Sequence, residues 1–305
     1  MATRAMSTPG TAARRLGARS PLSTVAHYTI MVLLAFVFVF PIVFMLMASF
    51  KTNEQIFADL RSLRAFLPVG DLSLANYTAV FTRSRFPRFL FNSVFISATT
   101  IILSLFVNSM AAYALSRLRW KGQKVVLAII IATLIIPGEA VVIPLLLLVS
   151  RLPSLSFSDG IAVTQGWLNT YHVQIIPFIA SAFSIFLFYQ FFQEIPRELD
   201  EAALVDGASR FQIYRQIIVP NSGPVFATVA IMTFLGTWSA FLWPIMVVQS
   251  EDIRPVMVGM QYFFQQNVQW GEVMAYATLV TLPMLALFLA FQRALSLIHI
   301  SEPTR

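Results

Sequence analysis

The sequence predicts an all-α, polytopic membrane protein, and two observations support that fold class. The chain has 305 residues, of which 57% are hydrophobic and only 11% are charged, and its mean hydropathy is +0.74. A soluble domain usually has about 25% charged residues. The apolar residues also fall in long runs, and a helix that rises ~1.5 Å per residue needs roughly 20 of them to cross the hydrocarbon core.

Six apolar runs are long enough, or nearly so, to be transmembrane helices. They cover about residues 28–50, 89–115, 125–149, 173–192, 226–248 and 273–291. The first run exceeds the ~7–15 apolar residues of a cleaved signal peptide, which favours a retained helix. Serine and threonine in the fourth and fifth runs should lie on faces turned toward other helices or a water-filled path. We therefore expect a six-helix domain over residues 23–293, preceded by a disordered basic tail over residues 1–22.

The distribution of Lys and Arg predicts the orientation of the chain. The short connection between the second and third runs is basic, with Arg117, Arg119, Lys121 and Lys124. Positive charges near the ends of short loops stay in the cytoplasm. The first outer loop also has basic residues, but they are spread over a longer segment. Both termini are therefore predicted to be cytoplasmic.

Several kinds of chemistry are excluded by composition. The chain has no cysteine, and its three histidines are scattered, so disulfides, a thiolate nucleophile and a metal site are not expected. No GxxxxGK[ST] run is present to bind ATP phosphates. The net charge of +7 fits cytoplasmic loops and lipid headgroups rather than nucleic acid. We expect no enzyme activity, no cofactor and no nucleic-acid partner.

A polar segment separates the fourth and fifth apolar runs. From Glu198 to Pro220 it reads ELDEAALVDGASRFQIYRQIIVP. Acidic residues suit the N-terminus of a first short helix, and Gly207 can end that helix in a left-handed conformation. Ser209 is a suitable N-cap for a second, amphipathic helix, which Pro220 is expected to end. The segment therefore predicts two short helices at the cytoplasmic side.

The spacing in this segment resembles the EAA motif of permease subunits in bacterial ABC importers. The matching positions are Glu201, Ala202, Ala203, Asp206, Gly207, Ile217 and Pro220, with Val219 where Leu is usual. Flanking segments narrow the resemblance to the carbohydrate-uptake branch, and within it to the group of the maltose-system G permease. They are IPGE at 136–139, LNTY at 168–171, FLWP at 241–244, TLP at 281–283 and FQR at 291–293.

The resemblance implies a role and a set of partners. The chain would be the membrane-spanning permease subunit of a binding-protein-dependent importer in the bacterial inner membrane. Its partners would be a homologous second permease subunit, two ATP-binding subunits that hydrolyse ATP, an extracytoplasmic substrate-binding protein and the lipid bilayer. The EAA segment would couple to an ATP-binding subunit. The alternative is a helix pair that lies on lipid, but such helices favour basic polar faces and the first helix here is acidic.

Four residues are candidates for the translocation path: Glu139, Trp238, Phe241 and Trp243. A carboxylate inside an apolar run usually faces a cavity or a partner, and aromatic faces suit the apolar faces of sugar rings. Each residue has a structural alternative, which we favour. Glu139 would then support a helix broken at Pro137 and Gly138, and the aromatic residues would pack against the second permease.

The outer loop over residues 249–272 is polar and aromatic, with Tyr262, Phe263, Phe264 and Trp270. The resemblance implies that this loop contacts the substrate-binding protein, and an interfacial aromatic belt is the alternative. Two segments depart from the family pattern. The connection over residues 151–167 is longer than usual, and residues 294–305 read ALSLIHISEPTR, which we interpret as an atypical, foreign tail.

The solute is predicted less directly than the type of transporter. A sugar or a sugar-like solute is the leading hypothesis. Because the EAA motif is widely shared, a polyamine, an amino acid or a phosphate ester is the nearest alternative. A stand-alone secondary transporter is the other alternative, but such proteins place paired ionisable residues in their spans, whereas Glu139 is nearly solitary.

Overall fold

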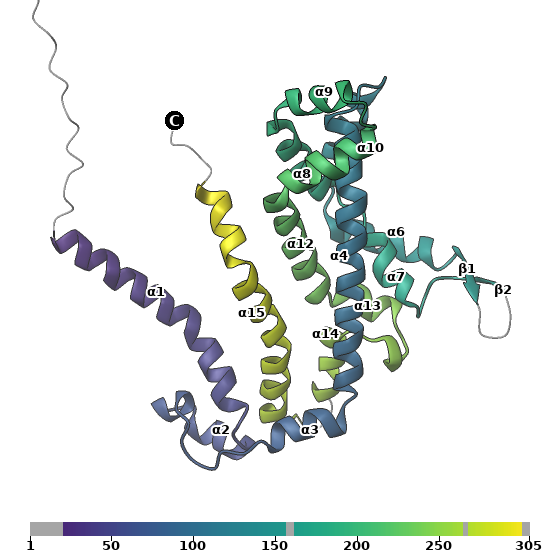
Figure 1. Cartoon of the computed structure of the whole chain (residues 1–305). Coiled ribbons are helices and arrows are strands. Elements are labelled where there is room, and N and C mark those ends of the chain that lie inside the picture. Colours follow the sequence, from purple (N-terminus) through teal and green to yellow (C-terminus); the bar gives the residue numbers. More distant parts are fainter. Residues whose placement is uncertain (1–20, 157–161, 265–267, 301–305) are drawn as a thin grey trace, which may run out of the picture.

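The structure is a computed structural model that describes residues 21–156, 162–264 and 268–300. Most of this part of the chain is helical, as predicted (Figure 1). Almost all of the tail at residues 1–22 and the last residues of the 294–305 segment lie outside the described residues.

The helices and strands follow one another along the described chain in this order: α1 (Pro21–Ala48), α2 (Asn53–Asp59), η1 (Leu63–Phe66), α3 (Ala75–Arg83), α4 (Phe86–Ser116), α5 (Gln123–Thr133), α6 (Gly138–Val149), β1 (Pro153–Ser156), β2 (Ala162–Gln165), α7 (Tyr171–Ile175), η2 (Ile176–Phe178), α8 (Ala182–Glu194), α9 (Arg197–Val205), α10 (Arg210–Ile213), η3 (Tyr214–Ile218), α11 (Val219–Asn221), α12 (Gly223–Trp238), α13 (Leu242–Val247), η4 (Glu251–Ile253), α14 (Val256–Gly259), η5 (Met260–Phe264) and α15 (Trp270–Ile300). The segment η3 is a π-helix, and the other η segments are 3-10 helices.

Within the described residues, three helices are long and apolar enough to cross a membrane individually: residues 24–48 of α1, residues 86–116 of α4 and residues 270–290 of α15. Three further pairs of helices meet the same criteria only together, because each pair is bent. The bend is 103° between α5 and α6, 42° between η2 and α8, and 81° between α11 and α12. Five of the predicted apolar runs thus coincide with described helices, or bent helix pairs, that have the length and composition of membrane spans. The third bent pair covers residues 210–238 rather than the predicted 226–248, and the number of complete crossings stays a prediction.

The bends lie where the sequence interrupts the helical hydrogen-bond ladder. Pro137 lies at the break before α6, and Pro177 lies in η2 just before the break at Ile179–Ser181. Proline cannot donate a backbone hydrogen bond and its ring opposes a continuous helix. The fifth apolar run, predicted over residues 226–248, is likewise interrupted, because α12 ends at Trp238 and α13 begins at Leu242.

The prediction that Pro220 ends the second polar helix is wrong. The helical backbone passes through the π-helix η3 and then α11, and it bends only at Ser222. Pro220 lies in the first turn of α11, where its missing N–H is tolerated because the widened π turn has already shifted the hydrogen-bond pattern. The Ser222 hydroxyl donates to the Ile218 carbonyl at 2.6 Å and supports the bend.

α4 is the central helix of the described chain and packs against both α8 and α12 (Figure 1). It buries a row of polar side chains: Asn92, Ser93, Ser97, Thr100, Ser104, Asn108 and Ser109. In a bilayer, buried polar groups and broken helices must find hydrogen bonds inside the protein. Asn108 illustrates this, since it donates to the Ile179 carbonyl at 3.0 Å and accepts from the Ser181 N–H at 2.9 Å. It thereby bridges the break between η2 and α8.

The elements differ widely in how much they are buried. One apolar cluster, around Phe188 and Ile213, joins α4, α8 and α10, and another, around Trp238 and Tyr276, joins α12 and α15. By contrast, the most apolar 18 residues of α1 include no buried residue, and α1 diverges from the body in Figure 1. Its apolar surface is the kind that lipid or a partner helix covers.

The long connection at residues 151–167 forms a β-hairpin, which is the exception to helix within the described residues. Strands β1 and β2 pair antiparallel, with Pro153 opposite Gln165, and the hairpin projects from the body beyond α6 (Figure 1). At its base the Trp167 indole N–H donates to the Pro153 carbonyl at 2.9 Å. The hairpin is therefore fixed at its base by the residues that lead into α7.

Candidate functional site

A cavity of about 670 Å³ lies among the broken helices. Residues of α4, α6, α7, η2, α8, α12 and α13 line it, so most of its wall comes from the ends of interrupted spans. Three of the four candidate path residues contribute to this wall, namely Glu139, Phe241 and Trp243. Irregular backbone at membrane depth is tolerated where it lines a cavity, which fits this arrangement.

Glu139 is in the first turn of α6, directly after the break at Pro137. Its side chain is exposed, and it is the one ionisable side chain among the described residues that line the cavity. The N-terminus of a helix favours a negative charge nearby. The position of Glu139 on α6 thus stabilises its carboxylate at the wall of the cavity.

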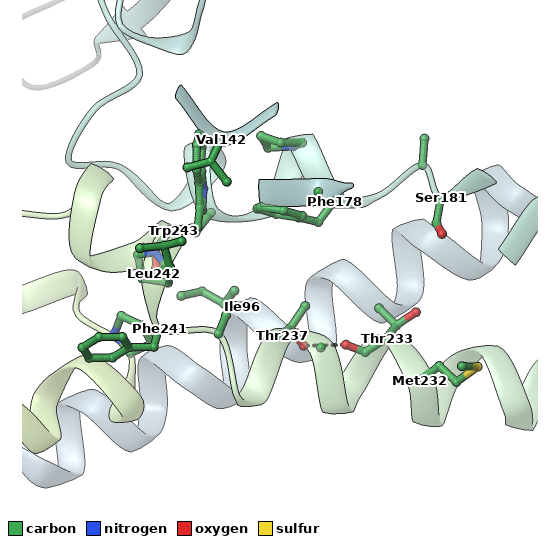
Figure 2. A pocket seen from close by; sticks show the side chains of 18 of the residues that line it. Ile96, Val142, Phe178, Ser181, Met232, Thr233, Thr237, Phe241, Leu242 and Trp243 are labelled. Carbon is green, nitrogen blue, oxygen red and sulfur yellow. Dashed lines mark hydrogen bonds between the residues drawn. The ribbon is translucent and has the colours of Figure 1, made fainter. Parts of the chain in front are cut away.

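An aromatic wall faces a wall that bears hydroxyl groups. Figure 2 shows Phe178 and Trp243 on one side of the cavity and Thr233 and Thr237 of α12 on the other. The Trp243 indole N–H donates to the Val173 carbonyl at 3.0 Å, and the Phe178 ring meets the indole edge-on. Trp243 is therefore held in one orientation, whereas Phe241 is 41% exposed.

Four of the six hydroxyl-bearing residues of the fourth and fifth apolar runs lie where the sequence predicted, whereas the hydroxyls of Thr228 and Ser239 donate to carbonyls of α12. Ser181, Ser184, Thr233 and Thr237 line the cavity, and the Thr237 hydroxyl also donates to the Ser97 hydroxyl of α4 at 3.0 Å. These faces are turned toward another helix and toward a hollow, because their polar groups would be costly against lipid.

Trp238, the fourth candidate path residue, is placed elsewhere. It is only 1% exposed and does not line the cavity. Its indole N–H donates to the Val280 carbonyl of α15 at 3.3 Å, and its ring stacks on Phe234. In the described chain it packs α12 against α15.

The segment from Glu198 to Pro220 forms the two predicted helices, and we call residues 197–222 the two-helix loop. Gly207 follows α9 with φ +83°, the left-handed conformation that favours glycine. Ser209 caps α10, and Gln212 completes a capping box with it. Both turn residues thus adopt the conformations that the sequence predicted.

The motif residues of the two-helix loop are mostly accessible. Glu201, Ala202, Asp206, Gly207 and Pro220 are exposed, whereas Ala203 and Ile217 are partly buried against the apolar cluster of α4 and α8. A Cβ added at Gly207 would meet nothing within 4 Å, so its surroundings are open. The loop therefore presents a small-residue surface at one end of the molecule (Figure 1).

A buried ion pair connects the two-helix loop to α4. The Arg117 guanidinium, which follows the last residue of α4, donates to the Asp200 carboxylate of α9 at 3.3 Å. It also donates to the carbonyls of Phe192 and Ile195, the latter at 2.6 Å. The side chains of the ion pair are only 2% and 11% exposed. One guanidinium thus binds the C-terminal end of α8 and the first turn of α9 together.

Two tyrosine hydroxyls join the same part of α4 to the second helix of the loop. The Tyr113 hydroxyl donates to the Arg210 carbonyl at 2.9 Å. The hydroxyls of Ser109 and Tyr214 lie 2.7 Å apart and share a hydrogen bond. Both helices of the loop are therefore bound to the last turns of α4.

The aromatic residues of the outer loop divide into two sets. Tyr262, Phe264 and Trp270 are exposed, and they stay candidates for contact with a partner. Phe263 is buried, and its ring lies against that of Tyr276 with the centroids 5.2 Å apart. Phe263 thus packs the loop onto α15.

Charged residues near α2, α3 and η4 form ion pairs of two kinds. Arg85 and Asp252 form an exposed pair at 2.5 Å. Lys51 and Asp59 form a buried pair at 2.9 Å, and the hydrogen bond from Lys51 lowers the pKa of the Asp59 carboxyl. Across the described residues there is no group of three His, Asp or Glu side chains that could hold a metal ion.

The model of one protein family, the "Binding-protein-dependent transport system inner membrane component", matches residues 105–297. The chain belongs to this family. The match includes the two-helix loop, α5 to α14, most of α15 and the end of α4 that precedes Arg117. The two-helix loop and most of the cavity wall are therefore parts of a binding-protein-dependent inner membrane component.

Two relatives share most of their length with this inner membrane component. It is 32% identical to the lactose transport system permease protein LacG of Rhizobium radiobacter, over 90% of this chain and 94% of the relative. It is 28% identical to the trehalose/maltose transport system permease protein MalG of Thermococcus litoralis, over 86% of this chain and 90% of the relative.

A solved structure supports the fold. A bacterial ABC transporter involved in the import of the acidic polysaccharide alginate contains a chain that superposes with a TM-score of 0.76. The identity is 21%, and the match covers 94% of this chain and 99% of that one. The inner membrane component thus has the fold of an ABC transporter chain along nearly its whole length.

Sequence reasoning missed the Arg117–Asp200 pair of this inner membrane component. In the sequence, Arg117 indicates only the orientation of the chain, and Asp200 is one of several acidic residues close to a predicted helix N-terminus. The partners are 83 residues apart in sequence, so no local spacing joins them. Asp200 shares a helix face with Ala203, three residues later, and only the structure shows that this face is turned inward.

Proposed function

We propose that this chain is the membrane-spanning permease subunit of an ATP-driven, binding-protein-dependent importer for a sugar or sugar-like solute. The observation that carries the proposal is the cavity among the broken helices, together with the exposed two-helix loop that α4 connects to it. The names of the two relatives, which transport lactose and trehalose or maltose, support a sugar as the solute.

The lining of the cavity suits a neutral, polyhydroxylated solute. Ligand sites combine apolar and aromatic walls with a few polar groups that fix orientation. Phe178, Phe241 and Trp243 supply the aromatic surface, and Thr233 with Glu139 supplies hydrogen-bonding groups for sugar hydroxyls. A phosphate ester or another anion would be repelled by the carboxylate of Glu139.

The two-helix loop is the proposed contact with an ATP-binding subunit. Ala202 and Gly207 are small and exposed, so a partner surface can approach them closely. Glu201 can form a charge-assisted hydrogen bond with a cation of the partner. ATP would be bound and hydrolysed by that partner, with two such subunits serving this chain and a second, homologous permease.

In the proposed topology the chain crosses the bacterial inner membrane six times and both termini are cytoplasmic. Three crossings are α1, α4 and α15, two are the bent pairs at residues 123–149 and 171–194, and the sixth is α12 followed by α13. The two-helix loop then lies in the cytoplasm, and α2, α3 and the outer loop lie outside. Tyr262, Phe264 and Trp270 would contact the extracytoplasmic substrate-binding protein.

The coupling part of the proposal is tested by co-purification with the ATP-binding subunit encoded beside this chain. Glu201→Arg places a cation at the proposed contact and should abolish both assembly and ATP-dependent uptake in proteoliposomes. Glu198→Arg is the matched control. Glu198 is also exposed on α9, and its substitution makes the same change of charge outside the motif. Normal assembly and uptake with Glu201→Arg would refute the proposed contact.

The solute is tested through the binding protein encoded beside the chain. Mass spectrometry of its bound ligand should identify a neutral sugar or polyol, and uptake of that compound should require this chain. A binding protein that holds only amino acids or polyamines would overturn the sugar assignment while leaving the transporter class intact.

A further inference from the structure

Arg117 is buried in a place where a charge is costly. Its side chain is 2% exposed, and its guanidinium contacts three oxygens that belong to α8, the residue after α8, and α9. Replacing a buried ion pair with apolar residues often leaves stability unchanged or improves it, whereas a paired buried charge can specify one arrangement of the elements around it. The pair therefore calls for a role other than stability.

We propose that Arg117 is a positioning residue that locks the two-helix loop to α4, so that the loop and α4 move as one rigid body during transport. The proposal rests on the proposed function, because it assigns the path by which movement at the loop reaches the cavity. In this arrangement α4 is the element that transmits the movement. The loop does not pivot on it.

The contacts of α4 with the loop are spread over one short stretch. Within residues 109–117, Ser109 and Tyr113 bind the second helix of the loop, and Arg117 binds the first. In the other direction, Arg197 of α9 donates to the Ser116 carbonyl at 3.2 Å. Rotation of the loop against α4 would break all of these hydrogen bonds, and several of them are buried, which makes that rotation costly.

The opposite half of α4 belongs to the cavity. Ser93 and Ile96 line the cavity, and they lie roughly 32–36 Å along the helix axis from Arg117 at ~1.5 Å per residue. α4 has proline only in its first turn, so it is a continuous rod between the two sites. Asn108 adds a link, since it binds Ile179 and Ser181 at the break of the fourth span, and Ser181 also lines the cavity.

The absence of cysteine from the chain makes a distance measurement direct. Spin labels are attached to Glu198→Cys on α9 and Ile102→Cys on α4, both exposed positions. A second pair combines Glu198→Cys with Leu282→Cys, an exposed position on α15. Both pairs are measured by pulsed electron paramagnetic resonance in the assembled transporter, without nucleotide and with ATP trapped.

The rigid-body proposal gives a specific result in the chain with native Arg117. The distance from Glu198→Cys to Ile102→Cys should be the same in both nucleotide states, whereas the distance to Leu282→Cys should change. A change between α9 and α4 as large as the change between α9 and α15 would overturn the proposal. This comparison requires no substitution at Arg117, so it does not depend on how well a variant folds.

Substitution of Arg117 supplies the second measurement. Arg117→Met should broaden the α9–α4 distance distribution and reduce solute uptake per ATP hydrolysed on the order of tenfold, within the usual range of coupling between sites. Arg117→Lys keeps the charge but not the planar fork of donors, and should restore uptake in part. Arg119→Met is the matched control, because Arg119 is exposed two residues away.

The two proposals fail in different ways. If Arg117→Met gives native distances and native uptake per ATP, Arg117 does not hold the two-helix loop to α4 and this inference is wrong. If the unsubstituted chain neither assembles with its ATP-binding subunit nor supports ATP-dependent uptake, the proposed function falls and this inference falls with it.

Discussion

The two ends of α4 hold their charged residues in opposite ways. At the end next to the two-helix loop, Arg117 is buried with Asp200. At the other end, Arg85 pairs with Asp252, and both side chains are more than half exposed. Breaking a buried pair costs about 3–5 kcal/mol, whereas an exposed pair contributes about 0–1 kcal/mol. The ion pair at the loop end thus contributes to fixing one geometry, whereas the ion pair at the other end contributes little to the stability of its surroundings.

The largest expected effect is at the buried end. Asp200→Ala leaves the Arg117 cation buried without its counterion, and should lower the free energy of unfolding by about 3–5 kcal/mol. Denaturant titration of the chain in detergent micelles measures this. Glu198→Ala on the same helix is the control and should change stability by less than about 0.5 kcal/mol. Equal losses of unfolding free energy for Asp200→Ala and Glu198→Ala would show that the buried ion pair does not stabilise the loop end more than an exposed charge does.

The buried pair near α2 allows a test by pH. The hydrogen bond from Lys51 lowers the pKa of Asp59, so folding is stabilised at pH values above the unfolded-state pKa of about 3.9. That stabilisation is lost as the pH falls through the lowered folded-state pKa. The thermal midpoint of Asp59→Asn should therefore be below that of the wild type at about pH 7 and should converge with it once the pH is below the lowered folded-state pKa of Asp59. A difference independent of pH would exclude this ionisation as its cause.

Arg83 is an intermediate case that sharpens the comparison. Its own side chain is 61% exposed, but its partner Glu272 is only 11% exposed, and the two groups are 2.6 Å apart. Arg83→Gln should lower the free energy of unfolding by about 1 kcal/mol, the upper end for exposed pairs. Unfolding at low and high salt checks it, since part of this contribution should persist in salt because the carboxylate is shielded. A loss of unfolding free energy as large as that of Asp200→Ala would contradict the idea that the contribution of an ion pair increases with its burial.

The smallest effect is expected at the exposed pair. Arg85→Gln should change stability by less than about 0.5 kcal/mol, and the change should disappear in high salt because exposed charges are screened. Thermal unfolding of the variant and the wild type at two salt concentrations is sufficient. A loss above about 2 kcal/mol would mean that this end is as rigid as the loop end.

The features that the sequence predicted well are those determined by residues close to one another in the chain. Gly207 and Ser209 adopt their expected conformations, because a left-handed turn and an N-cap are satisfied within a few residues. The break at Pro137 follows from proline itself. The apolar runs are recognisable because the length of a span is set by the bilayer. Such features are encoded locally, and sequence reasoning places them correctly.

The sequence could not distinguish residues whose environments depend on packing between distant segments. Phe241 and Trp243 line the cavity, whereas Trp238 packs against α15, although all three are aromatic residues of one apolar run. Pro220 was expected to end a helix, but the π-helix before it changes the local hydrogen-bond pattern. The Arg117–Asp200 pair requires the positions of two segments that only the fold brings together.

The length of α4 has a consequence for the membrane around it. Its 31 residues correspond to about 46 Å at ~1.5 Å per residue, whereas the hydrocarbon core is about 30 Å thick. A helix longer than the bilayer accommodates a change of thickness by tilting. Arg117, at the last turn, would then stay in the polar headgroup region or beyond it in thin and thick bilayers alike. In the proposed topology, the excess length of α4 would therefore keep the buried ion pair insensitive to hydrophobic mismatch.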